Sequence, residues 1–171
     1  QPTFIDALVA RGKQYELGAY DHVLFSYHGL PERQVDKVYS EGLCSDHDCE
    51  SEMTEENKFC YKATCYATTR LLAERLNIPK DKYTVCFQSR LDKEWLEPFS
   101  DKVVEDCARR GMKKILVFSP AFTADCLETI IEIGDEYQEI FKEHGGEKVQ
   151  LVESLNDHPL WIRCLKELVS E

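Results

Sequence analysis

The chain has 171 residues, 43% of them hydrophobic, and its 21 basic and 32 acidic residues leave a formal net charge of −11 at pH 7. This length predicts one domain, over 1–171, with a core large enough to be stable without disulfides. The negative charge argues against nucleic acid or an anionic membrane as the main partner, whereas an acidic surface suits cations.

The sequence also carries information about the compartment. No apolar run approaches the roughly 20 residues of a membrane span, and the first residues lack the basic and apolar regions of a signal peptide. Eight cysteines could indicate a disulfide scaffold, but such scaffolds are usually small, and half of these cysteines lie singly in expected strands and helices. We therefore expect a soluble, cytoplasmic protein in a reducing compartment.

Hydrophobic periodicity predicts helices that alternate with strands. The expected helices span 4–17, 61–76, 102–110, 124–144 and 159–169, and the expected strands span 22–27, 83–89, 115–119 and 148–155. A further helix start is expected at 54–57, and Asn156 or Asp157 is placed to cap the last helix. These spacings suit right-handed crossovers, so we predict a doubly wound α/β fold with a parallel four-stranded sheet and helices on both faces.

The expected strand at 115–119 leads into a helix rich in acidic residues. The first turns of this helix carry Asp125, Cys126 and Glu128. From Glu128 the acids recur at offsets of four, seven, eight and eleven, at Glu132, Asp135, Glu136 and Glu139. These offsets place them on one face of an α-helix as a row of oxygen ligands for metal. A solvated helix face is the alternative, above all for Glu136 and Glu139.

The loops after parallel strands open at one edge of the sheet, where ligands bind in open α/β folds. His28, after the first strand, should therefore look toward Asp125 and Glu128. An imidazole with a carboxylate suits a divalent transition metal, or a pair of bases that removes protons from nitrogen. A structural histidine is the alternative. The aromatic residues near these strand ends could form a wall for a flat ligand, or could simply be core residues: Tyr27, Phe87, Trp95 and Phe122.

A second cluster lies in a polar excursion at about 34–65. It contains two cysteine pairs with equal internal spacing, Cys44 with Cys49 and Cys60 with Cys65. Four thiolates suit either a structural zinc ion or an iron–sulfur cluster, and His47 could replace one ligand. Unligated thiols are the remaining alternative.

Three ordered motifs closely resemble those of ferrochelatases, which insert ferrous iron into protoporphyrin IX to make protoheme. They are Phe25-Ser-Tyr-His-Gly-Leu-Pro-Glu32, Phe87-Gln-Ser-Arg90 followed by Trp95-Leu-Glu-Pro98, and Ser119-Pro-Ala-Phe-Thr-Ala-Asp-Cys-Leu-Glu-Thr129. The resemblance covers essentially the whole chain. It implies a chelatase-like, Rossmann/flavodoxin-like domain that forms the second half of a two-domain enzyme, with the porphyrin bound between this domain and an N-terminal one.

The resemblance also implies roles for individual residues. It makes His28 and Glu128 catalytic, and it assigns iron binding or transfer to His28, Glu128, Asp125, Glu132, Asp135 and Glu136. Tyr27, Phe122 and Trp95 would contact the porphyrin. Cys126 stands where many members of the family have histidine.

The cysteine-rich segment resembles one found in some bacterial ferrochelatases and associated there with a 2Fe–2S cluster, which favours iron–sulfur over zinc. We expect the domain alone to be inactive and its membrane contact to be at most peripheral. Two rival hypotheses remain: a cobalt or nickel chelatase acting on another tetrapyrrole, and a non-catalytic iron–sulfur or zinc-binding module.

Overall fold

The computed structural model describes residues 1–170, which fold around a single four-stranded sheet. Its strands are β1 (His22–His28), β2 (Tyr83–Gln88), β3 (Lys114–Phe118) and β4 (Lys148–Leu151). All neighbouring strands are parallel, in the order β2-β1-β3-β4. The central strands are buried almost throughout, as is usual for a parallel sheet covered on both sides. The predicted parallel four-stranded sheet is confirmed.

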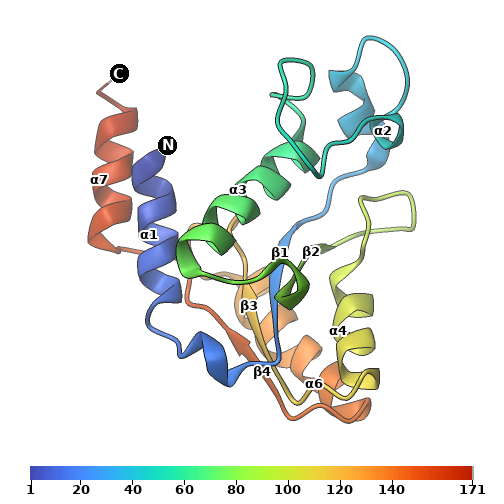
Figure 1. Ribbon diagram of the computed structural model, residues 1–171, viewed down its shortest axis with the longest axis vertical. Helices are drawn as coiled ribbons and strands as arrows, with labels where there is room; N and C mark the ends of the chain where they lie inside the picture. Colours follow the sequence, from blue (N-terminus) through green and yellow to red (C-terminus); the bar gives the residue numbers. More distant parts are fainter. Residues whose placement is uncertain (171) are drawn as a thin grey trace.

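Helices cover both faces of this sheet (Figure 1). On one face, α1 (Pro2–Gly12) and α3 (Tyr61–Leu76) pack on side chains such as Phe25 of β1. On the other face, α4 (Ser100–Arg109) and α6 (Tyr137–Glu143) pack on side chains such as Leu24. Helix α7 (Pro159–Leu168) lies against α1. Neighbouring residues of β1 thus belong to different cores because side chains alternate along a strand.

Shorter helical segments connect these elements. They are η1 (Leu17–Ala19), α2 (Glu32–Val35), η2 (Asp36–Val38), η3 (Cys44–Asp46), η4 (Lys80–Lys82), α5 (Leu127–Ile130) and η5 (Glu132–Glu136). None of the helices between residues 1 and 170 is both long and apolar enough to cross a membrane.

Two predicted elements are shorter than expected. Helix α1 ends at Gly12 and not at residue 17. Gly12 lies against the sheet, since a Cβ at this position would be 2.8 Å from Cζ of Phe118. Strand β4 ends at Leu151, not at residue 155, because the chain then turns toward Asp125, whose Oδ1 accepts a hydrogen bond of 3.1 Å from the amide of Ser154.

Two local predictions were wrong. Residues 54–57 form a turn instead of starting a helix, since the side chain of Asn57 accepts a hydrogen bond of 2.7 Å from the Thr54 amide and α3 begins only at Tyr61. The last helix is capped by His158, whose Nδ1 accepts a hydrogen bond of 3.2 Å from the Leu160 amide. Asn156 instead adopts a positive φ of 49°.

The long acidic helix is interrupted. Asp125 and Cys126 precede its first turn, α5, and η5 is a π-helical segment between α5 and α6. The carbonyl of Ile131 accepts hydrogen bonds from the amides of Asp135 (3.0 Å) and Glu136 (2.9 Å). Because a π-turn holds one more residue than an α-turn, the acids do not follow the single α-helical face that their spacing predicted.

Candidate active site and metal centre

His28 is the last residue of β1 and lies at the carboxyl edge of the sheet. Its Nδ1 is 2.6 Å from the carbonyl oxygen of Gly29. Because a carbonyl can only accept, Nδ1 must carry the hydrogen, and the neutral ring keeps its lone pair on Nε2. The ring lies between Trp95 and Phe122, with centroid distances of 6.3 and 6.0 Å. His28 can therefore accept a proton or bind a metal from within aromatic surroundings.

The loops after β1 and β2 are joined directly. The Gly29 amide donates to the Gln88 carbonyl at 2.7 Å, and the Leu96 amide donates to the Leu30 carbonyl at 2.9 Å. Glycine is required at position 29, since a Cβ there would lie 2.9 Å from the Gln88 oxygen and 3.2 Å from the Trp95 ring. This close approach places Trp95 beside His28.

Glu128 is the second residue of α5 and is partly exposed. Hydrogen bonds from its own backbone amide and from Cys126 lower the pKa of its carboxyl group, and the electrostatic interaction with nearby His28 lowers it further. The two residues predicted to be catalytic thus lie near enough to interact electrostatically. They combine an ionised carboxylate with an imidazole nitrogen at one edge of the sheet.

Asp125 faces a different way. Its carboxylate accepts hydrogen bonds from the Ser154 amide (3.1 Å) and from Nδ2 of Asn156 (2.8 Å), while its own amide donates to Oδ1 of Asn156 (2.9 Å). Burial raises the pKa of Asp125, but the bonds from Asn156 and Ser154 outweigh it, so the pKa is lowered. In this arrangement Asp125 ties the loop before α5 to the loop after β4.

The carboxylate of Glu132 is also occupied. Its Oε2 accepts from Nε2 of Gln88 (3.0 Å) and from Oγ of Ser89 (2.5 Å), and its Oε1 accepts from the Ser89 amide (2.8 Å) and the Tyr137 hydroxyl (3.0 Å). A carboxylate has about four acceptor sites, so binding of a metal by Glu132 would have to displace one of these donors.

The remaining acids of the predicted row lie on the surface. Asp135 and Glu136 are exposed. Glu136 and Glu132 line an open hollow of about 420 Å³ together with Arg90 and its ion-pair partner Asp101. The structure therefore brings Glu132 and Glu136 together but holds Asp125 apart from them.

Tyr27 lies on the opposite face of the sheet from His28. It is 3% exposed, its hydroxyl is 2.8 Å from Oγ1 of Thr69 in α3, and Phe87 belongs to the same core. Of the three residues predicted to contact a porphyrin, only Trp95 and Phe122 flank His28. The alternation of side chains along a strand, applied to neighbouring positions 27 and 28, could have shown this from the sequence.

Sequence reasoning also missed Gln88 and Ser89, which bond to Glu132. The sequence did contain a signal: Gln88 directly follows the largely apolar run from Tyr83 to Phe87. A buried polar side chain at such a position needs hydrogen-bonding partners.

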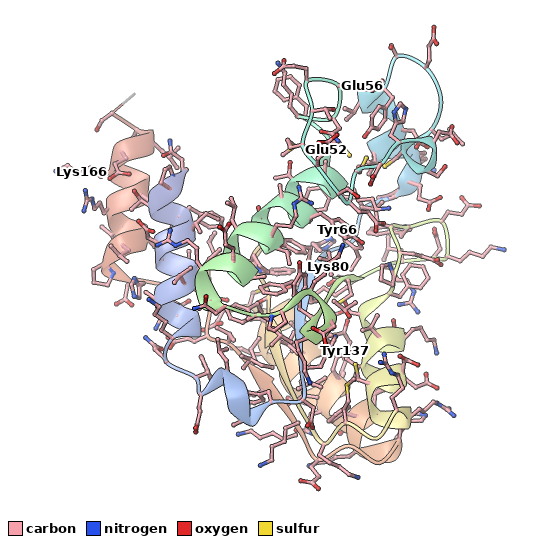
Figure 2. The ribbon with its side chains drawn as sticks, in the orientation of Figure 1. Glu52, Glu56, Tyr66, Lys80, Tyr137 and Lys166 are labelled. Carbon is pink, nitrogen blue, oxygen red and sulfur yellow. The ribbon has the colours of Figure 1, made fainter. Side chains whose placement is uncertain are left out.

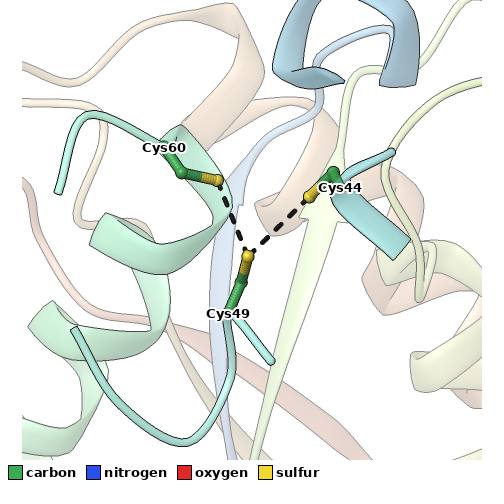
Figure 3. Close-up of side chains that lie close together, drawn as sticks. All are labelled: Cys44, Cys49 and Cys60. Carbon is green, nitrogen blue, oxygen red and sulfur yellow. Dashed lines mark hydrogen bonds between the residues drawn. The ribbon is translucent and has the colours of Figure 1, made fainter. Parts of the chain in front are cut away.

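Three of the four predicted cysteine ligands converge. We call Cys44, Cys49 and Cys60 the thiol triad; their sulfur atoms all lie within 4.8 Å of one another (Figure 3). The distances from Sγ of Cys49 are 4.0 Å to Cys44 and 3.9 Å to Cys60. All three are buried.

Cys65 does not join this group in the structure. It is buried in α3 and lies in the same core as Tyr27 and Phe87. Burial raises its pKa to about 12. Cys60 precedes the first turn of α3, whereas Cys65 and Thr69, four residues apart, share the side of α3 that faces the sheet.

The surroundings of the thiol triad favour a charged form for only one of its members. The Tyr39 hydroxyl lies 2.6 Å from Sγ of Cys49. Burial raises the pKa values of Cys44 and Cys49. Burial also acts to raise the pKa of Cys60, but hydrogen bonds from Tyr39 and neighbouring groups outweigh it and lower that pKa.

The cysteine-rich segment projects from one end of the molecule, with Glu52 and Glu56 on its outer loop (Figure 2). It nevertheless contacts the candidate active site. Tyr61, which follows Cys60 and begins α3, donates a hydrogen bond of 2.8 Å to the backbone carbonyl of His28. The thiol triad and His28 are thus separated by one residue and one hydrogen bond.

The chain is similar to known proteins along its whole length. A protein-family model described as Ferrochelatase matches residues 1–171. Two similar curated proteins are the ferrochelatase of Ectopseudomonas mendocina (strain ymp), 45% identical over 171 residues, and that of Pseudomonas fluorescens (strain SBW25), 46% identical over 172 residues. Each alignment covers 98% of this chain but 50% of the relative. The chain therefore spans about half the length of the curated relatives that it matches.

Proposed function

Because the chain belongs to the ferrochelatase family, we propose that it forms the C-terminal half of an enzyme that inserts ferrous iron into protoporphyrin IX to give protoheme, the last step of heme biosynthesis. The observation that carries the proposal is that His28 and Glu128 both lie at the carboxyl edge of the sheet, His28 at the end of β1 and Glu128 beside the end of β2 through the bond from Gln88 to its backbone oxygen. The Nδ1 hydrogen bond of His28 and the lowered pKa of Glu128, to which His28 contributes, support the proposal.

The chemistry requires two kinds of group. When Fe(II) enters the macrocycle, the two pyrrole nitrogens that carry hydrogen must each release a proton, so the site needs proton acceptors and a metal ligand. Nε2 of His28 and the carboxylate of Glu128 supply both kinds: one accepts protons and the other positions the iron. Trp95 and Phe122, on either side of His28, offer apolar surface to a flat porphyrin.

The exposed acids have a role in delivery of the substrate iron. Asp135 and Glu136 present carboxylate oxygens to solvent beyond Glu132, and such oxygens bind divalent cations weakly enough to pass them on. Glu132 would join this route only by giving up one of its donors.

We further propose that the thiol triad holds a resident metal group, a 2Fe–2S cluster, with zinc as the alternative. Three buried sulfurs within 4.8 Å of one another supply three of the four ligands that either group takes, and Cys65, which faces the sheet in the structure, would have to turn toward the thiol triad to supply the fourth. Such a group would cross-link the segment and, as iron–sulfur, would exchange one electron. The residues themselves lie outside the crevice, so their role is structural or redox-sensing, with Tyr61 as the connection to His28.

The partner of this half is an N-terminal ferrochelatase domain, which the chain requires because the porphyrin would lie between the two halves. We therefore expect the 171-residue chain alone to be inactive. We expect the complete enzyme to be cytoplasmic, with at most peripheral membrane contact.

The test joins this chain to the N-terminal half of the Pseudomonas fluorescens relative and follows the loss of porphyrin fluorescence with Fe(II) under anaerobic conditions. His28→Ala should abolish insertion. His144→Ala, at the end of α6, is the matched control and should leave insertion unchanged. Full activity of His28→Ala would remove the role proposed for His28.

Two further outcomes would point to the alternatives. Insertion of cobalt or nickel into sirohydrochlorin, with none of iron into protoporphyrin, would indicate a different chelatase. A folded protein that holds metal at the thiol triad but does not bind either tetrapyrrole would indicate a non-catalytic metal-binding module.

A further inference from the structure

Three polar side chains interrupt the apolar face of the sheet that α4 and α6 cover. Ser26 of β1, Gln88 of β2 and Ser100 of α4 are each 0% exposed. On the same face, Leu24 and Cys86 pack with apolar residues of α4 and α6. Burial of polar groups destabilises a fold unless they are hydrogen-bonded, so the bonds made by these residues need explanation.

The bonds fix the orientation of the Gln88 amide. Its Nε2 lies 2.7 Å from the backbone oxygen of Glu128 and 3.0 Å from Oε2 of Glu132. Both partners are acceptors, so the amide must present its NH2 group to them and uses both of its hydrogens.

The remaining directions follow from this orientation. Oε1 of Gln88 must accept the hydrogen of Ser26 Oγ, which lies at 2.8 Å. Ser26 Oγ, having donated, must accept from Ser100 Oγ, also at 2.8 Å. All the hydrogen bonds therefore point one way, from the start of α4 through β1 and β2 to the segment that carries Glu128.

Ser89 completes the attachment of this segment to the sheet. It has a positive φ of 59°, which is unfavourable for a residue with a side chain. In this conformation both its amide and its hydroxyl donate to Glu132, at 2.8 and 2.5 Å. A strained backbone that serves two bonds to one carboxylate indicates that the position of Glu132 is tightly determined.

We propose that Gln88 is a positioning residue: it holds the turn between Glu128 and Glu132, where α5 gives way to the π-helical segment, at a fixed place relative to His28. It acts through the carbonyl of Glu128 and the carboxylate of Glu132 and does not itself touch the substrate. The inference rests on the proposed function, since it assigns a purpose to the placement of Glu128.

A purely structural role would not need these bonds. An unbranched apolar side chain of similar length, such as methionine, would fill the same space between the sheet and α5. Methionine could not donate hydrogen bonds to the Glu128 carbonyl and the Glu132 carboxylate at the same time. The test therefore replaces Gln88 by methionine and compares it with Ser100→Ala, which removes a buried hydroxyl from the same set of bonds without touching Glu128 or Glu132.

Two measurements are needed. Hydrogen–deuterium exchange of the 171-residue chain should show faster exchange over 127–137 in Gln88→Met, with Ser100→Ala close to the parental protein. In the joined two-half protein, kcat for iron insertion should fall by about 10- to 100-fold in Gln88→Met, the range usual for residues that orient a ligand, while KM for porphyrin stays near the parental value. Should Gln88→Met fail to fold, Gln88→Asn, whose shorter amide cannot reach both acceptors, carries the same expectations.

The proposal is overturned if Gln88→Met retains parental exchange over 127–137, if kcat is unchanged, or if Ser100→Ala lowers kcat equally. Failure of the proposed function would look different: the parental joined protein would insert no iron, while the exchange experiment would still report whether Gln88 holds the segment.

Discussion

Asp125 offers a direct test of whether a predicted metal ligand is in fact part of the scaffold. We consider the substitution Asp125→Asn, which preserves shape and removes the charge. In the structure the carboxylate accepts one hydrogen bond from the Ser154 amide and one from the Asn156 side chain. Asparagine keeps one acceptor oxygen but must turn an NH2 group toward the other donor.

The expected loss of stability follows from these bonds. A hydrogen bond to a charged group contributes about 1.5–3 kcal/mol. Asp125 is only partly buried, so we discount this for solvent screening and expect Asp125→Asn to lower the free energy of unfolding by about 1–2 kcal/mol at pH 7. For a domain of this size that corresponds to a fall in Tm of about 2–8 °C.

The effect should depend on pH in a defined direction. The pKa of Asp125 is lowered in the folded protein, so its stabilising contribution is present above the ordinary aspartate pKa of about 4 and is lost as the pH falls through the folded-state pKa. The difference in stability between the parental protein and Asp125→Asn should therefore be largest at neutral pH and shrink below about pH 4.

Urea unfolding followed by far-UV circular dichroism, at pH 7 and pH 3, measures this difference. Asp106→Asn is the control, because Asp106 is exposed and its contact with Arg110 is 3.5 Å long. Equal stability of Asp125→Asn and the parental protein at pH 7 would refute the reasoning. A loss of iron insertion as complete as in His28→Ala, without destabilisation, would show that Asp125 is a ligand after all.

Three further predictions concern other parts of the site. Gly29→Ala should destabilise the protein by about 1–3 kcal/mol and lower the rate of iron insertion, because the new Cβ would meet the Gln88 carbonyl. Thermal melts and the insertion assay measure the two effects. Gly18→Ala is the control and should change neither, because no atom lies within 4 Å of its added Cβ. Tyr39→Phe removes a hydroxyl that can donate a hydrogen bond to the sulfur of Cys49. Because such bonds stabilise the reduced cluster, the reduction potential of the proposed iron–sulfur cluster should become more negative. Spectroscopic redox titration measures the potential, and an unchanged value would contradict this prediction. Cys60→Ser should lower the metal content of the purified protein, measured by elemental analysis, whereas Cys107→Ser, in α4, should not.

The predicted fold was largely correct because it depends on patterns within single segments. Runs such as Val23 to Phe25 and Ile115 to Phe118 are apolar at every position, which is characteristic of strands covered on both faces. The alternation of these runs with amphipathic helices predicts a parallel, doubly wound sheet. The ends of elements were less well predicted, since α1 stops where Gly12 meets Phe118 and β4 stops where the chain turns to Asp125.

The sequence by itself placed His28 and Glu128 at one edge of the sheet, because parallel strands bring their following loops together. It also placed the cysteines in one segment. Only the tertiary structure decided which cysteines and which acids share a surface: three cysteines converge while Cys65 faces the sheet, and Glu132 is held by Gln88 and Ser89. These outcomes depend on contacts between residues distant in sequence and on a π-turn that changes the helical phase, and neither is encoded in local periodicity.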